Sequence, residues 1–163
     1  GYALPSQEGL STVNSRLCAM SENHLDCVRD ALEVGIQWGT EVTIGQSNHL
    51  VSQVYCSALP IAYTDLATDL WERFARLILE AAYEATVCAG IINASKKQNR
   101  TLFLTLLGGG AFGNPEVWIF DAILRALSLY EAHGLDVVLV SYGAPHPCAT
   151  DLVESWNRRQ GCF

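Results

Sequence analysis

Two apolar runs of strand length restrict the fold of this chain more than any other feature of its sequence. Thr101–Leu107 (TLFLTLL) and Asp136–Tyr142 (DVVLVSY) carry apolar residues at successive positions instead of alternating ones. A strand that is apolar on both faces is typical of a sheet covered by helices on both sides. The two runs therefore predict an α/β fold with a largely parallel or mixed sheet.

Three main helices are predicted between and before these strands from their capping residues. The first helix begins after the N-cap Ser21 and ends before Gly35. The second begins at Asp69, with Glu72 completing a capping box. The third begins at Asn114-Pro115 and ends at Gly134, which is expected to be a left-handed C-cap. The second helix has a broad apolar face made of Trp71, Phe74, Ala75, Ile78, Ala81 and Ala82, extending towards Val87. The remaining predictions are strands at Glu41–Ile44 and Leu50–Leu59, a loop at Ser95–Arg100 and a short terminal helix at Asp151–Arg159.

Composition limits the class of protein and its partners. The 163 residues fit one domain, and a charged fraction of 17% is below the roughly 25% of average soluble domains. The richest apolar stretch, Leu77–Ile92, is interrupted by Glu80 and Glu84, so no run reaches the ~20 residues of a membrane span. A net charge of −7 argues against nucleic acid or an anionic membrane as the main partner. We expect a single soluble domain.

The six cysteines predict neither a metal site nor a disulfide framework. They form no C-x-x-C pair, and the histidines are not at ligand spacing. In a domain with a full core, such cysteines are expected to be buried, reduced thiols. The sequence also carries no signal peptide, so the expected location is cytoplasmic or nuclear.

A glycine-rich segment carries the strongest indication of chemistry. It consists of Gly108, Gly109, Gly110, Ala111, Phe112, Gly113 and Asn114, between a predicted strand and a predicted helix. Glycines let successive backbone N–H groups approach a ligand, and a helix N-terminus adds partial positive charge, so a phosphate or pyrophosphate is the expected guest. The spacing matches neither a P-loop nor a dinucleotide-binding fingerprint. A glycine-rich turn that binds no ligand is the alternative.

Several segments together resemble a known family. VYCSALPIAY, WERFARLILEAAYEATVCAG, TLFLTLLGGGAFGNPEVWIFDAI and LDVVLVSYG resemble macrodomains, the ADP-ribose-binding fold. The likeness is greatest to the MavL-like class of arginine-specific (ADP-ribosyl)hydrolases, and it runs from about Thr40 to Gly143. GGGAFGN, with its flanking strand and tryptophan, is the most specific part.

The resemblance implies a fold and a binding site. The fold would be a three-layer αβα sandwich with a mixed central sheet, formed by residues 1–163 as one domain that lacks its first strand or obtains it differently. Gly108–Asn114 would bind the pyrophosphate of ADP-ribose. The other expected ligand-binding residues are Ser57, Ala58 and Leu59 beside the ribose, and Ser141, Tyr142 and Gly143 near the adenine. The N-terminal stretch departs from the macrodomain pattern; Asn14, for a ribose hydroxyl, and Arg16, for phosphate, are its best candidates, and an ordinary loop role is the alternative for each.

The implied activity is removal of mono-ADP-ribose from protein arginine, without a metal or redox cofactor. A carboxylate would bind the guanidinium or direct water in this cleavage, and Asp121 and Asp65 are the best candidates. Each also has a purely structural interpretation, as an ion pair with Arg125 and as a turn residue respectively. Weaker candidates are Asp69, Glu80 and Glu8, while Tyr63 is placed either over the ribose or in the core, and Trp71 and Trp118 in the core.

Two other functions use the same fold. A non-catalytic reader of ADP-ribosylated proteins would need the same cleft and no catalytic acid. A phosphatase or nucleotide hydrolase would need a metal or a nucleophile, and the sequence offers no clear candidate for either. The expected partners are therefore ADP-ribose and a mono-ADP-ribosylated protein.

Overall fold

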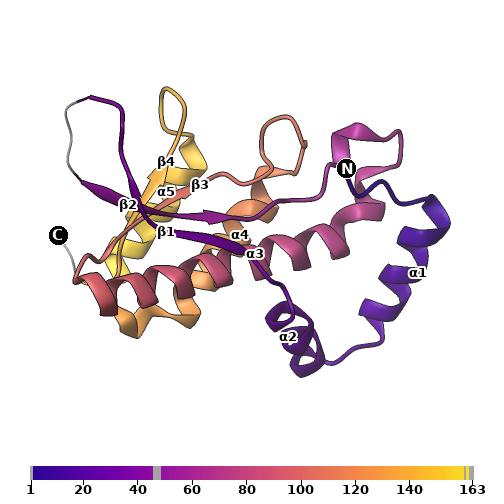
Figure 1. Cartoon of the computed structure of the whole chain (residues 1–163). Helices are drawn as coiled ribbons and strands as arrows, with labels where there is room; N and C mark the ends of the chain where they lie inside the picture. The colour runs from indigo at the N-terminus through magenta and orange to yellow at the C-terminus, as the bar shows by residue number, and fades with distance from the viewer. Residues whose placement is uncertain (1, 46–48, 160, 162–163) are drawn as a thin grey trace.

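A long helix, α3, runs through the middle of the molecule, with the strands on one side and two N-terminal helices on the other (Figure 1). The computed structural model describes residues 2–45, 49–159 and 161. The elements in chain order are α1 Gln7–Cys18, α2 Glu22–Asp30, β1 Gly35–Glu41, β2 Leu50–Tyr55, α3 Thr68–Lys97, β3 Thr101–Thr105, α4 Glu116–Leu129, β4 Asp136–Val140 and α5 Pro147–Arg159, with 3₁₀ turns at Ile61–Tyr63 and Glu131–His133. This arrangement confirms the α/β class.

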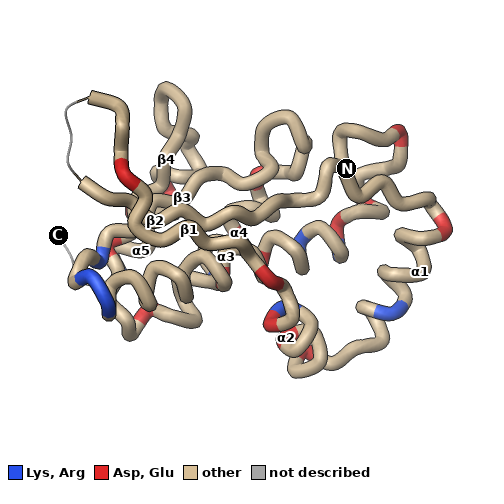
Figure 2. Tube along the Cα trace, in the orientation of Figure 1, with Lys and Arg blue, Asp and Glu red and all other residues tan. Residues whose placement is uncertain are grey.

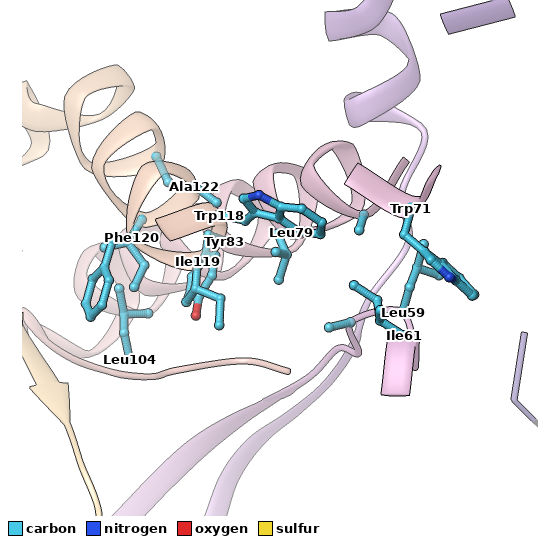
Figure 3. Close-up of a cluster of buried hydrophobic side chains, with 14 of the residues drawn as sticks. Leu59, Ile61, Trp71, Leu79, Tyr83, Leu104, Trp118, Ile119, Phe120 and Ala122 are labelled. Atoms are coloured by element: carbon cyan, nitrogen blue, oxygen red, sulfur yellow. The ribbon is translucent and has the colours of Figure 1, made fainter. Parts of the chain in front are cut away.

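The core lies between α3, α4 and the strands. Figure 3 shows Trp71, Leu79 and Tyr83 of α3 among the side chains that α4, β3 and the segment after β2 contribute. The predicted apolar face of α3 is confirmed, because Trp71 and Ala75 are fully buried and its other members are buried or packed against the core. By length and composition α3 could also cross a membrane, but its buried face makes it the central helix of this core.

The ends of the helices differ from the prediction at several positions. Helix α3 begins one residue earlier than predicted, with Ala67 at the cap position, so Asp69 lies within the first turn and forms no capping box. It continues through Lys97 and ends at Gln98, which takes a left-handed φ of 58°. The predicted loop at Ser95–Arg100 is therefore wrong in its first half. Gly134 has the predicted left-handed conformation, but it follows a 3₁₀ turn.

The described strands form two separate pairs instead of one sheet. β1 and β2 are antiparallel, whereas β3 and β4 are parallel and in register from Thr101 opposite Asp136 to Thr105 opposite Val140. The strand predicted at Glu41–Ile44 is wrong, since β1 occupies the residues before it. The other strands are shorter than predicted, because the chain leaves each ladder to form a loop at its carboxyl end.

One face of the β3–β4 pair is open to solvent. Leu102, Leu104 and Leu139 turn towards the core, but Phe103 between the first two is 64% exposed. Val138 is also exposed. The prediction of strands buried on both faces is therefore wrong for the part of the chain that the structure describes, and the three-layer sandwich stays a prediction.

The N-terminal region is helical where a loop is predicted. Residues 7–18 form α1, capped by the Ser6 hydroxyl, which accepts a hydrogen bond from the Gly9 N–H at 3.1 Å. Helix α2 starts at the predicted N-cap Ser21 but ends at Asp30, short of Gly35. Both helices pack against α3 on the side away from the strands (Figure 1).

Ion pairs between side chains join helix α2 to α3 and α4, and the most buried residue of α2 is Arg29. Arg29 and Arg125 are surrounded by carboxylates at N–O distances of 2.6–3.8 Å. The carboxylates are Glu22, Asp26, Glu80 and Glu84. The apolar stripe predicted for α2 contributes less, since Val28 is 38% exposed.

Glu84, one of these carboxylates, should make the stability of the fold depend on pH. Burial raises the pKa of Glu84 above its ordinary 4.5, although the hydrogen bond and charge of Arg125 act in the opposite direction. A carboxyl group with a higher pKa in the folded than in the unfolded chain stabilises the fold when protonated, and this contribution is lost as pH rises through the raised value. We therefore expect wild type to lose stability relative to Glu84→Gln as pH increases from 4.5 through that value. Urea unfolding of both proteins across this range measures it, and a constant difference would contradict it.

Candidate ligand-binding site at the carboxyl ends of the strands

A buried asparagine joins the two segments that sequence analysis assigns to the ligand. Asn114 is 3% exposed, and its Nδ2 donates to the backbone oxygens of Leu59 at 2.8 Å and Gly108 at 3.3 Å. The Ala62 N–H donates to the Phe112 oxygen at 3.0 Å. The structure thus brings the glycine loop, residues 108–114, against the segment after β2. Asn114 makes this connection instead of capping α4, whose cap position is Pro115.

Two of the loop's glycines are required by this contact. Gly108 has a φ of +77°, and a Cβ there would lie 2.4 Å from the Cβ of Ala58. Gly113 has a φ of +70°, and its Cβ would lie 2.8 Å from the Cβ of Ala62. Gly110 differs from both, because nothing lies within 4 Å of its Cβ position and its φ is not positive. Packing therefore explains Gly108 and Gly113, but not Gly110.

The tip of the glycine loop presents free backbone donors. The N–H groups of Gly109, Gly113 and Asn114 bond to carbonyls within the turn. Those of Gly110, Ala111 and Phe112 have no acceptor in the part of the chain that the structure describes. Consecutive free N–H groups on a turn are suited to an anion. The loop contains no Lys or Arg (Figure 2), so these donors would carry most of the recognition.

Three aromatic rings meet beside this tip. Tyr63, from the 3₁₀ turn, contacts Phe112 edge to face with ring centroids 5.5 Å apart. Tyr2 contacts both rings in the same manner, at 4.9 Å and 5.8 Å. Burial, with the neighbouring Tyr2 hydroxyl, raises the pKa of Tyr63, which still exposes 43% of its surface. The ring of Tyr63 therefore lies beside the loop and outside the core. No sequence signal indicated Tyr2.

A second buried side chain, Tyr83, holds the backbone that leads from β3 into the glycine loop. Tyr83 of α3 donates its hydroxyl to the Thr105 oxygen at 2.7 Å and accepts from the Leu107 N–H at 2.9 Å. It thereby satisfies the backbone on both sides of Leu106, where β3 has ended. Burial raises the pKa of Tyr83 well above its ordinary value, so this hydroxyl stays protonated at physiological pH.

Tyr83→Phe is expected to lower the free energy of unfolding by about 1–3 kcal/mol, because it removes two part-buried hydrogen bonds worth roughly 0.5–1.5 kcal/mol each and leaves the Leu107 N–H and the Thr105 oxygen only their 3.0 Å bond to each other. Urea unfolding measures the change. The control is Tyr55→Phe, which removes a hydroxyl from an exposed tyrosine and should change stability by less than about 0.5 kcal/mol. Equal effects of the two variants would contradict the role given to Tyr83.

The two predicted catalytic carboxylates lie in different places. Asp65 is exposed in the bend after Tyr63, two residues beyond the ring that contacts Phe112 of the loop. Asp121 forms an ion pair with Arg76 of α3 at 2.7 Å, and not with Arg125 as its structural interpretation predicts. On α4, Ile119 faces Gly109, and Asp121 is two positions further, roughly 200° around the helix. No interaction that involves Asp121 reaches the glycine loop.

The weaker carboxylate candidates also lie away from the loop. Glu80 pairs with Arg29, and Asp69 lines a separate cavity of about 630 Å³ between α1, α2 and α3. Asn14 lines the same cavity, and its Nδ2 donates to the Leu70 oxygen at 2.7 Å. Glu8 and Arg16 are exposed on α1. The N-terminal ligand residues are therefore not brought to the glycine loop, because the segment expected to reach it is a helix on the opposite side of α3.

The other predicted contacts are met only in part. Ser57 is exposed, but Ala58 and Leu59 are buried in the core, so only the backbone of these two borders the loop. Tyr142 is fully exposed in the turn after β4. Gly143, with a φ of +84°, has nothing within 4 Å of its Cβ position. Trp71 and Trp118 lie in the core as predicted.

The cysteines are free thiols, and several are accessible. Among the described residues Cys18, Cys27, Cys56, Cys88 and Cys148 form no disulfide, and Cys162 lies outside the described residues. The prediction of buried thiols is wrong for Cys18, Cys27 and Cys148, which are exposed. Burial raises the pKa of Cys56, which does not favour a thiolate there.

The chain matches no family model, no curated protein and no solved structure among those with which it was compared.

Proposed function

We propose that this protein is a macrodomain-like (ADP-ribosyl)hydrolase, which binds ADP-ribose and cleaves its N-glycosidic bond to protein arginine. The observation that carries the proposal is the row of free N–H groups at Gly110, Ala111 and Phe112, held beside the segment after β2. The proposal includes the three-layer αβα arrangement that the resemblance implies, with α3 and α4 as one helical layer.

The proposed reaction needs no resident metal or redox cofactor. Water adds to the anomeric carbon of the ribose as the bond to the guanidinium nitrogen breaks, and the products are ADP-ribose and arginine. The loop N–H groups would bind the pyrophosphate, and the Tyr63 ring would pack against the ribose. Asp65 would bind the guanidinium or direct the water. Asp121 has no part in this scheme, because Arg76 already engages it away from the loop.

The alternative is a reader that binds ADP-ribose and leaves the modified protein intact. It is favoured by one observation, which is that only Asp65 of the two predicted carboxylates belongs to a segment that contacts the loop. The predicted partners are the same for both functions.

The test is release of ADP-ribose from matched peptides modified on arginine, serine or glutamate. Release from the arginine peptide alone supports the hydrolase, and Asp65→Asn should then reduce the rate about 100-fold or more while ADP-ribose affinity changes little. Asp151→Asn, at an exposed position on α5, is the matched control. Calorimetric binding of ADP-ribose without release identifies a reader. Absence of both binding and release overturns the proposal.

A further inference from the structure

Three side chains with metal-binding atoms gather where α4 and α5 begin. They are Glu116 in the first turn of α4, His146 just before α5, and Cys148 in the first turn of α5. One ligand atom from each lies within 4.8 Å of the other two. The sequence did not indicate this cluster, because Glu116 belongs to an earlier helix and only the fold brings it to His146.

The histidine of this cluster is held on two sides. Its Nε2 lies 2.8 Å from the Oε2 of Glu116, and its ring stacks on Phe120 with centroids 6.2 Å apart and an interplanar angle of 25°. Phe120 is buried, so it gives the ring a fixed support. Glu116 and His146 are nevertheless 44% and 38% exposed at their side chains, and Cys148 is exposed. A cation and a water molecule can therefore reach all three.

We propose that Glu116, His146 and Cys148 form a Zn²⁺ site, completed by one water molecule. Carboxylate, imidazole and thiolate are the usual ligands of zinc, and three protein ligands with an open fourth position are typical of accessible zinc sites. The thiolate and carboxylate together cancel the two positive charges. The N-termini of α4 and α5 each oppose a cation by only about half a charge, so the two anionic ligands outweigh them.

Binding requires specific rearrangements, because the three ligand atoms lie within 4.8 Å of one another and not yet at tetrahedral separations. Tetrahedral ligands about 2.0–2.2 Å from zinc lie roughly 3.3 Å apart, so the Glu116 and His146 atoms would separate by a few tenths of an ångström. The Cys148 thiol would release its proton to solvent. With zinc on Nε2, the ring proton moves to Nδ1, and the 3.3 Å hydrogen bond from the Cys148 N–H to Nδ1 is lost. This is a long bond, and its loss costs less than three metal–ligand bonds contribute.

Zinc at this site would attach the carboxyl end of the turn after β4 to helix α4. Tyr142 and Gly143 lie in that turn, and a metal held by His146 and Cys148 would tie its far end to α4. The inference rests on the cluster alone and holds whether or not the protein binds ADP-ribose.

The test uses the whole chain without an affinity tag, freed of metal, and Co²⁺ alone as a spectroscopic probe for zinc. We expect one Co²⁺ per chain, with tetrahedral visible bands and a thiolate charge-transfer band, both removed by an equivalent of Zn²⁺. Cys148→Ser should abolish the charge-transfer band, and His146→Ala should weaken Co²⁺ binding about 100-fold. Circular dichroism verifies that each variant is folded.

The matched control is Cys27→Ser, which removes another exposed thiol and should leave the spectrum unchanged. The proposal is overturned if wild type binds no Co²⁺. It is also overturned if the thiolate band survives Cys148→Ser, or if His146→Ala binds as tightly as wild type.

Discussion

Gly108→Ala is expected to lower the free energy of unfolding by about 2–5 kcal/mol, because it combines backbone strain with a steric clash. The left-handed φ of +77° costs a residue with a Cβ roughly 1–2 kcal/mol. The new methyl group would also lie 2.4 Å from the Cβ of Ala58 and 2.7 Å from Nδ2 of Asn114, and overpacking of this kind costs a further 1–3 kcal/mol or so. Neither neighbour can move easily, because both are buried.

Two control variants separate these causes. Gly143→Ala places a methyl group at a φ of +84° in open space, so it should show the backbone cost alone. Gly110→Ala has neither a positive φ nor a neighbour within 4 Å and should leave stability nearly unchanged. Urea unfolding of the three variants should therefore rank them Gly108, Gly143, Gly110. If Gly108→Ala lowered the free energy of unfolding no more than Gly143→Ala, the contact between the glycine loop and the segment after β2 would be refuted.

Arg29→Ala is expected to lower the free energy of unfolding by about 3 kcal/mol. The Arg29 side chain is 6% exposed and bonds to Glu22, Asp26 and Glu80 at 2.6–2.8 Å. Burial lowers the pKa of Arg29, but its hydrogen bonds and charge interactions with Glu80 and Glu22 outweigh this, so the guanidinium stays charged. Removing one partner of a buried ion pair typically costs 3–5 kcal/mol or so, and the lower end applies because Glu22 and Asp26 are largely exposed.

The same substitution should free α2 from α3. Hydrogen exchange of the α2 amides is expected to accelerate more than exchange in α4, because α4 keeps its apolar contacts with α3. Arg16→Ala, at an exposed position on α1, is the control and should change stability by less than about 0.5 kcal/mol. A loss equal to this control would mean that the ion cluster contributes nothing to the attachment of α2.

The features that sequence analysis predicts correctly are those set by nearby residues. The apolar face of α3 depends on a spacing that repeats along one helix, and the left-handed Gly134 depends on one turn. The glycine loop is likewise recognisable from its own residues. Its position beside Ala58 and Leu59 is at the carboxyl ends of β2 and β3, the edge of the strands at which sequence analysis expects it.

The errors concern residues whose partners are distant in sequence. Asn114 has the local properties of an N-cap, yet its amide is taken by the Leu59 oxygen across the fold. Asp121 is spaced to pair with Arg125, but Arg76 lies closer in space. Gly9 and the polar residues around it favour a loop, and packing against α3 makes the segment a helix instead. Tertiary contacts decide each of these cases.

The link between Asn114 and Leu59 has a consequence for how the loop can change. Residues 108, 113 and 114 are held by contacts of the fold, whereas 110 and 111 are exposed and nothing lies within 4 Å of the Cβ position of Gly110. The base of the loop is therefore assembled without a ligand, so the proposed binding of ADP-ribose would lose little ordering entropy. It also follows that substitutions at the tip would alter the proposed recognition in a protein that unfolds at the same denaturant concentration as wild type.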